Sequence, residues 1–126
     1  MPGPSAFGPE RKLPGKADFD RVFAEARFRI RRHPFMLLAR PRPTEPSRLG
    51  LVVGRKHARR AVRRNLIRRL ARESFRLTHF PHPVDVVLLA RPGAADVDRD
   101  ELRATLDQLW DRLERDLRRF APEAEP

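Results

Sequence analysis

The chain has 126 residues, a net charge of +11 and no cysteine, so it is long enough for one domain and excludes disulfides and thiolate metal sites. No apolar run reaches the roughly 20 residues of a membrane span, and the N-terminus lacks the apolar stretch of a secretory signal. We therefore expect no membrane partner and, by elimination, a cytoplasmic location.

The charge is distributed unevenly along the chain. Residues 1–80 contain 21 Lys and Arg against 6 Asp and Glu, whereas residues 81–126 contain 7 against 11. A polyanionic partner explains this asymmetry, because each phosphate contact releases condensed counterions. Nucleic acid is favoured over a membrane surface, since the apolar helix faces are needed for a core. Arginine far outnumbers lysine, which fits phosphate recognition and equally fits a GC-rich genome.

The predicted elements begin after a tail over residues 1–10, whose prolines and glycines indicate disorder. Apolar residues spaced along one helix face then predict a helix over residues 17–26. Apolar runs predict strands over residues 28–33, 35–40 and 49–53. Because a proline-rich loop joins the last two strands, we expect them to form an antiparallel hairpin.

The rest of the chain alternates between helix and strand. We predict a helix over residues 58–77, a buried strand over 84–90 and a helix over 98–120 whose apolar stripe packs on the core. The order α-β-β-β-α-β-α predicts an α+β fold, a two-layer sandwich of one sheet with helices packed on it. This single domain is expected to cover residues 11–120, followed by a C-terminal tail over 121–126.

The helix over residues 58–77 carries the clearest functional signal. At about 100° per residue, its apolar residues fall on one side, and arginines with one asparagine fall on the other. Residues 55–72 contain nine basic residues and no acid, whereas a merely solvated face would mix signs. No short-turn helix pair accompanies it, which makes DNA less favoured than RNA. The candidate nucleic-acid-binding residues are Arg55, Lys56, Arg59, Arg60, Arg64, Asn65, Arg68, Arg69 and Arg72.

Aromatic rings are a second candidate component, because exposed rings in basic grooves stack on the bases of single strands. Phe19 and Phe23, on the first predicted helix, are candidates for this role. Their spacing alone fits core positions better, so both interpretations stay open at this point.

Groups for catalysis by the chain itself do not converge in the sequence. The four histidines are scattered, and His79 and His82 have no third metal ligand nearby. The carboxylates of the last helix alternate with arginines, whereas a two-metal phosphodiesterase needs convergent carboxylates. We therefore expect a binding protein that holds no cofactor or metal by itself.

The segment RLGLVVGRKHARRAVRRNLIRRLARESFRL, at residues 48–77, closely resembles the signature of the bacterial ribonuclease P protein subunit. Three further segments resemble that family in the same order. They are DFDRVF at residues 18–23, HPFMLLAR at 33–40 and VDVVLLARPGAA at 84–95. The resemblance covers roughly residues 11–120.

This resemblance implies a function. Ribonuclease P is a ribonucleoprotein endoribonuclease that removes the 5′ leader from precursor tRNA. Its large RNA subunit is expected to carry the active site and the magnesium ions, while the protein subunit binds that catalytic RNA and the single-stranded leader of precursor tRNA. The family fold has a left-handed β-α-β crossover, against the usual right-handed rule.

The resemblance also assigns roles to residues of this chain. Contacts with the catalytic RNA are implied for Arg64, Asn65, Arg68, Arg69 and Arg72. The leader-binding cleft of the family falls on Phe19, Phe23 and Leu38, the last at a position where relatives often carry an aromatic ring.

One residue departs from the family motif, which usually reads Arg-Asn-Arg. Leu66 takes the place of the second arginine. Because it projects toward the apolar side of the helix and away from Arg64 and Arg68, we expect it to cost little RNA affinity.

Two alternative functions remain open: a ribosomal or general RNA-binding protein of chaperone type, and a nuclease that acts alone.

Overall fold

The computed structural model of the protein describes residues 8–55 and 60–124, with side chains up to residue 120. Its order of elements confirms the predicted α-β-β-β-α-β-α arrangement. The elements are η1 (Pro9–Arg11), α1 (Lys16–Glu25), β1 (Phe28–Arg32), β2 (Phe35–Pro41), β3 (Arg48–Val52), α2 (Ala61–Arg76), β4 (Val84–Ala90), η2 (Ala94–Asp96) and α3 (Arg99–Ala124).

The element ends differ from the predictions by a few residues. The first turn η1 begins inside the predicted N-terminal tail, of which residues 1–7 lie outside the described residues. Helix α3 continues to Ala124 and so enters the segment predicted as a C-terminal tail. Its start is close to prediction, because the Asp98 carboxylate accepts hydrogen bonds from the backbone N–H groups of Asp100 (3.2 Å) and Glu101 (3.4 Å).

The four strands form one mixed sheet in the order β1-β2-β4-β3. Strand β2 pairs antiparallel with both β1 and β4, whereas β3 pairs parallel with β4. The predicted hairpin between residues 35–40 and 49–53 is therefore wrong. The physical reason lies in β4, whose residues are almost all buried. A strand buried in this way needs a neighbour on each edge, so β4 lies between β2 and β3.

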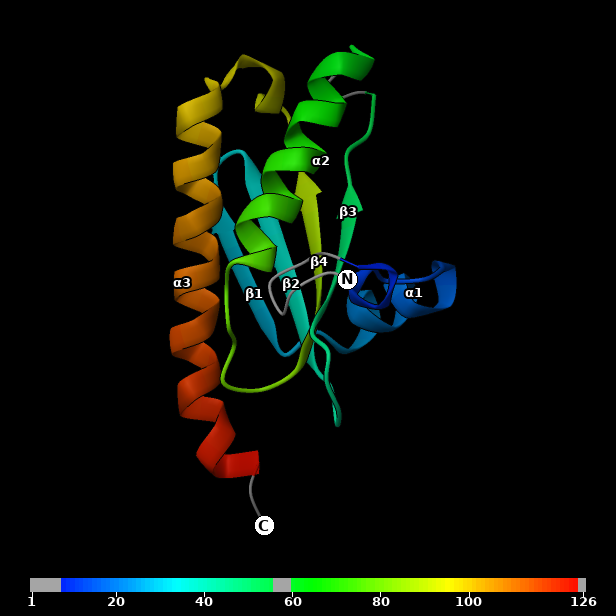
Figure 1. The fold of residues 1–126 in the computed structure, drawn as a ribbon, viewed down its shortest axis with the longest axis vertical. Coiled ribbons are helices and arrows are strands. Elements are labelled where there is room, and N and C mark those ends of the chain that lie inside the picture. The colour runs from blue at the N-terminus through cyan, green and yellow to red at the C-terminus, as the bar shows by residue number, and fades with distance from the viewer. Residues whose placement is uncertain (1–7, 56–59, 125–126) are drawn as a thin grey trace.

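Helix α2 makes the crossover between the two parallel strands. In Figure 1 both strands run upward, α2 lies in front of the sheet, and β4 lies to the left of β3. This geometry is the left-handed crossover that the family resemblance implied.

Side chains cover the two faces of the sheet very differently. On one face α2 and α3 pack on a large apolar cluster that includes Phe35, Leu88, Phe75 and Trp110. On the other face α1 covers only a small cluster built from Leu13, Val22, Leu38 and Val87. Among the helices in the described part of the chain, none combines the length and apolar character that a bilayer crossing requires.

Candidate RNA-binding surfaces

Helix α2 presents one side to the core and the rest to solvent. Its fully buried side chains are Ile67, Leu70, Ala71, Ser74 and Phe75. The exposed side chains include Asn65 and Arg69, while Arg64, Arg68 and Arg72 are partly exposed. The arginines predicted to bind RNA therefore surround the solvent side of one helix.

The buried arc of α2 is rotated relative to the prediction because of Phe75. In projection this residue lies at about 220° from Val62, between Arg64 and Arg68, yet it is fully buried. Its ring packs edge-on against Trp110 of α3, with 5.4 Å between ring centroids. Val62, on the opposite side, is 72% exposed. The aromatic contact thus decides which side of the helix faces the core.

Helix α3 contacts one flank of α2, which leaves the other flank to the arginine row. Arg103 of α3 lies 3.8 Å from the Glu73 carboxylate, and the Ser74 hydroxyl donates a hydrogen bond to Asp107. In Figure 1 α3 lies to the left of α2 and β3 to its right. Arg64, Arg68 and Arg72 project away from the α3 flank, so they lie along the side of α2 nearest the edge strand β3.

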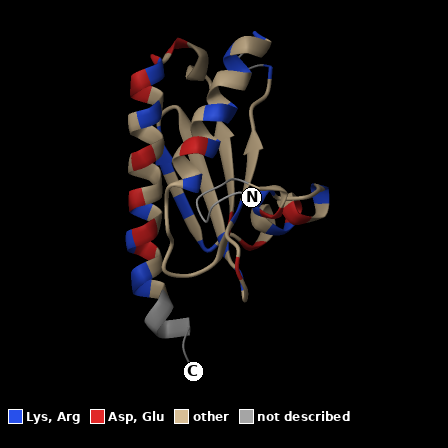
Figure 2. Ribbon diagram, in the orientation of Figure 1, with Lys and Arg blue, Asp and Glu red and all other residues tan. Residues whose placement is uncertain are grey.

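The arginines of α2 are not neutralised by their own helix. Glu73 is its single acid, and that carboxylate faces Arg103 of α3. Within residues 8–55 and 60–124, Arg68, Arg69 and Arg72 form no ion pair. Figure 2 shows the contrast with α3, along which red and blue positions alternate. This concentration of unpaired positive charge is what a phosphate backbone requires.

The remaining predicted basic residues lie at or before the start of α2. Arg55 and Arg60 are exposed, whereas Lys56 and Arg59 lie outside the described residues. Arg63 turns inward instead, and its guanidinium donates a hydrogen bond to the carbonyl of Val97.

The predicted leader-cleft residues lie on the opposite face of the sheet. Phe23 is 40% exposed on α1. Phe19 packs over Gly50 of β3, where an added Cβ would lie only 2.5 Å from the ring, so this close approach requires glycine. Leu38 is 4% exposed and belongs to the cluster beneath α1. Phe23 is therefore the most accessible of the three side chains.

A partly buried ion pair holds α1 against this face of the sheet, and the sequence patterns did not reveal it. Arg48 of β3 donates two hydrogen bonds of 2.8 Å to the Asp85 carboxylate of β4 and lies 3.3 Å from Asp18 of α1. The hydrogen bonds from Arg48 to Asp85 raise the pKa of the Arg48 guanidinium above its ordinary value, against the opposing effect of burial. Register could have suggested the pair, since Arg48 and Asp85 are direct partners in the parallel ladder.

Metal-ligating side chains do not gather in the part of the chain that the structure describes. No group of three or more His, Asp or Glu side chains within the described ranges is arranged to hold a metal ion. Three carboxylates of α3 pair with arginines instead, in Arg103–Asp107, Arg112–Asp116 and Arg118–Glu114.

Known proteins share both the sequence and the fold. A family described as Ribonuclease P matches residues 7–114. The ribonuclease P protein component of Chromohalobacter salexigens is 39% identical over 95% of this chain and 94% of its own length. That of Saccharophagus degradans is 40% identical over 86% of this chain and 81% of its own length.

Two solved structures extend the likeness to the fold. The RNase P protein from Thermotoga maritima is 33% identical, with a TM-score of 0.69 over 80% of this chain and 96% of that chain. The RNase P protein of Staphylococcus aureus, 24% identical, has the same fold, with a TM-score of 0.74 over 82% of this chain and 94% of that chain.

The chain therefore belongs to the ribonuclease P protein family. As a protein component of ribonuclease P, it is a subunit of a tRNA-processing ribonucleoprotein and has an RNA partner.

Proposed function

We propose that this chain binds the catalytic RNA of ribonuclease P through α2 and the 5′ leader of precursor tRNA through the face of the sheet that carries α1. The observation that carries the proposal is the basic face of α2, where Arg68, Arg69 and Arg72 have no acidic partner within the described residues. Leaving these charges together costs electrostatic repulsion in the free protein, and phosphate contacts relieve it.

The leader site in this proposal is separate from α2. Phe23 offers an exposed ring on which a base can stack, a contact that every base can make. Phe19 fixes the distance between α1 and β3 through its contact with Gly50. Because Leu38 is covered, its contribution is to support α1 from beneath. The two RNA strands would thus be bound on opposite faces of the sheet.

Cleavage in this proposal belongs to the RNA subunit and its magnesium ions, as the family resemblance implies. The protein would raise the affinity for precursor tRNA by holding the leader, and it would reduce the magnesium requirement by adding positive charge near the RNA. A two-metal phosphodiester cleavage needs convergent carboxylates, and the α3 carboxylates Asp107, Glu114 and Asp116 each pair with an arginine.

Reconstitution tests this function. The purified chain is combined with the cognate catalytic RNA at low magnesium, and cleavage of precursor tRNA is mapped at the 5′ end. We expect accurate cleavage only when both components are present. Cleavage by the protein alone would instead establish an independent nuclease. Tight RNA binding without restored cleavage would identify a general RNA-binding protein.

A further inference from the structure

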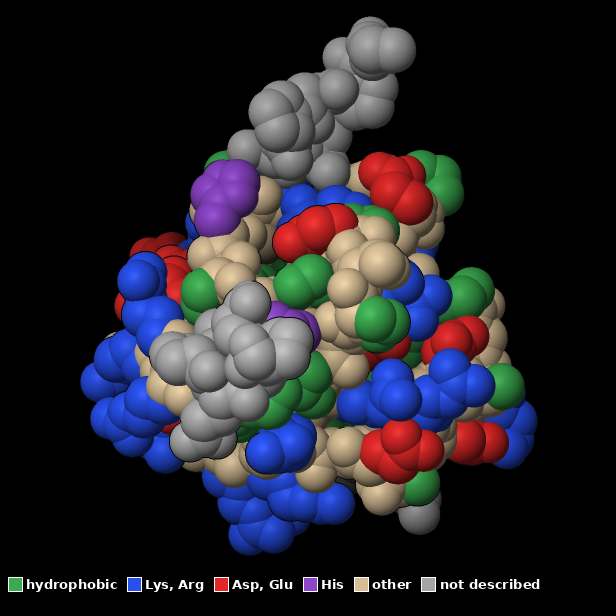
Figure 3. Space-filling view, turned by 90° about the horizontal axis from the view of Figure 1, so that it is seen from below, with side chains coloured by type: hydrophobic (Ala, Val, Ile, Leu, Met, Phe, Trp, Pro, Cys, Tyr) green, Lys and Arg blue, Asp and Glu red, His purple; other side chains and the backbone are tan. Residues whose placement is uncertain are grey.

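A groove between β1 and α3 forms a second basic surface. Its volume is about 230 Å³, and Ile30 and Leu109 supply apolar side chains to its lining. Four arginines line it, two from each element: Arg31, Arg32, Arg112 and Arg115. Strand β1 is the edge of the sheet opposite β3, so the groove lies on the other side of the molecule from the arginine row of α2. Figure 3 shows basic side chains gathered on the side of the molecule that carries α3 and β1.

The positive charge of this groove is only partly neutralised. Arg32 donates a 2.5 Å hydrogen bond from Nε to Oε1 of Gln108, a neutral partner that orients the guanidinium and leaves its charge intact. Arg112 pairs with Asp116 at 3.3 Å. In the part of the chain that the structure describes, Arg31 and Arg115 have no ion pair.

Arg115 differs from the other α3 arginines that have a described acid four residues away, because it forms no ion pair with that acid. Arg103 and Arg118 on the same helix each pair with an acid four residues away. Arg115 has such an acid in Asp111, which also lines the groove, but no ion pair within 4.0 Å joins the two side chains. If the charges of α3 served only to keep the helix solvated, Arg115 would pair with Asp111, as Arg103 and Arg118 pair with their acids.

Protection of a sheet edge explains part of this pattern. Charged side chains on an edge strand prevent pairing with another chain, and the arginines of β1 serve that purpose. Edge protection does not require arginines from a neighbouring helix to converge on the same strand. Arg32 lies on the same face of β1 as the core residue Ile30 and so points toward α3, whereas Arg31 points to the opposite face of the sheet. The convergence of Arg112 and Arg115 on Arg32 therefore points to an anion between the two elements.

We propose that this groove binds the phosphate backbone of an RNA segment other than the one bound by α2. The planar guanidinium forks suit phosphate oxygens. Three strand spacings, about 14 Å, separate the two edges of the sheet, so one RNA backbone does not follow both surfaces without wrapping around the protein. The inference rests on the proposed RNA-binding function and adds a second contact, through which the protein fixes two RNA segments relative to one another.

A tethered cleavage reagent tests the position of the RNA directly. The chain has no cysteine, so a single introduced cysteine carries an iron–EDTA group at one defined place. Asp111→Cys places the reagent in the groove, and Asn65→Cys places it on α2. Glu101→Cys is the matched control, because it removes the same charge from an exposed position about 15 Å away on α3. Each variant is assembled with end-labelled catalytic RNA, with and without end-labelled precursor tRNA.

We expect the Asp111→Cys reagent to cut a segment that the Asn65→Cys reagent does not cut. The labelled strand that is cut identifies the source of the backbone, the catalytic RNA or the precursor tRNA. Cleavage from Asp111→Cys no stronger than from Glu101→Cys, while Asn65→Cys still cuts, would overturn the groove proposal alone. Absence of cleavage from both Asp111→Cys and Asn65→Cys would overturn the proposed RNA contact of α2 as well.

A charge variant provides the second test. R32Q/R115Q removes two groove arginines that have no acidic partner within the described residues, and R103Q/R118Q removes two arginines that are already paired with acids. We expect R32Q/R115Q to bind the RNA identified above about tenfold more weakly, and the slope of log affinity against log salt to fall by about two, as for two lost phosphate contacts. The control is expected to change affinity less than about threefold. Equal effects of the two double variants would contradict the proposal, and thermal melting verifies that both fold.

Discussion

Helices α2 and α3 pack side by side on the same face of the sheet and carry the same number of arginines, yet their charges are organised in opposite ways. Each helix contains six arginines, but α2 has one acid and α3 has seven. In α3 three of the arginines pair with an acid four residues away, as in Arg112–Asp116. The comparison teaches that the number of arginines does not distinguish the two helices, whereas the shortage of acidic partners does, and this shortage favours α2 as the proposed helix for the main RNA contact.

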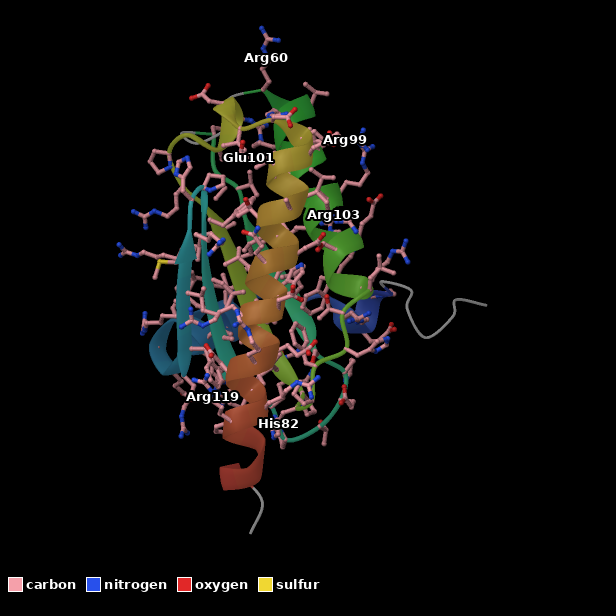
Figure 4. All side chains as sticks on the ribbon, turned by 90° about the vertical axis from the view of Figure 1, so that its left-hand side faces the viewer. Arg60, His82, Arg99, Glu101, Arg103 and Arg119 are labelled. Carbon is pink, nitrogen blue, oxygen red and sulfur yellow. The ribbon has the colours of Figure 1, made fainter. Side chains whose placement is uncertain are left out.

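The view along the sheet edge refines this comparison. In Figure 4 Arg99 and Arg103 lie on the side of α3 nearer α2, and Arg119 lies on the side nearer β1. Arg103 is paired with acids of both helices. Arg103 thus joins the two helices, whereas Arg112 and Arg115 line the basic groove at β1.

The largest effect is expected where the two helices share a core. Phe75→Ala removes the ring that packs against Trp110 and leaves a cavity, so we expect the free energy of unfolding to fall by about 4 kcal/mol. Leu77→Ala, one residue beyond the same helix and 53% exposed, is the control and is expected to cost less than about 1 kcal/mol. Urea denaturation measures both. A similar loss in the two variants would show that Phe75 does not join α2 to α3.

The second-largest effect is expected at the Arg48–Asp85 ion pair, compared with an ion pair that is exposed to solvent. Asp85→Asn removes the carboxylate that accepts two hydrogen bonds from the partly buried Arg48 and leaves it only the more distant Asp18, and we expect a loss of about 3 kcal/mol in unfolding free energy. Asp20→Asn breaks the exposed Lys16–Asp20 pair and is expected to cost less than about 0.5 kcal/mol. Denaturation of the two variants in the same buffer tests this difference. If the Asp85 variant were as stable as the Asp20 variant, the Arg48–Asp85 ion pair would not contribute to holding α1 on the sheet.

A smaller effect is expected at the separate leader site. Phe23→Ala removes an exposed ring, so binding of precursor tRNA by the holoenzyme should weaken about tenfold through lost stacking, while stability changes by less than about 1 kcal/mol. Mature tRNA, which lacks the leader, is the matched ligand, and its affinity should not change. Equal weakening for both RNAs would place Phe23 outside the leader contact.

The smallest effect is expected at the position where the chain departs from its family motif. Leu66 is partly buried and packs against the main apolar cluster, on the side away from Arg64 and Arg68. Leu66→Arg should therefore leave the affinity for the catalytic RNA within about threefold of the original chain. Filter binding at fixed salt measures it, and a tenfold gain would mean that position 66 belongs to the RNA contact.

The fold was predictable where local patterns decide it. The spacing of Leu102, Leu106, Leu109 and Leu113 predicts α3, and all four side chains are fully buried. Strand order was not predictable in the same way, because the pairing of β3 with β4 depends on contacts between residues far apart in the chain. A proline-rich loop fits a hairpin and a longer connection equally well.

The basic helix was predictable in composition but not in orientation. The arginine row is visible at a period of 3.6 residues, whereas the burial of Phe75 depends on Trp110, which lies 35 residues further along the chain. The groove at β1 escaped prediction for the same reason, since Arg32 and Arg115 come to line one groove only through the packing of α3 on the sheet edge. The roles assigned to Phe19, Phe23 and Leu38 come from the family resemblance and stay predictions.

The salt dependence of binding to the catalytic RNA tests the central claim most directly. R68Q/R72Q removes two unpaired arginines from α2, and R103Q/R118Q removes two paired arginines, so both variants lose the same charge. If unpaired charge on α2 forms the RNA contact, the slope of log affinity against log salt should fall by about two for R68Q/R72Q and stay unchanged for R103Q/R118Q. Identical slopes for the two variants would contradict the account.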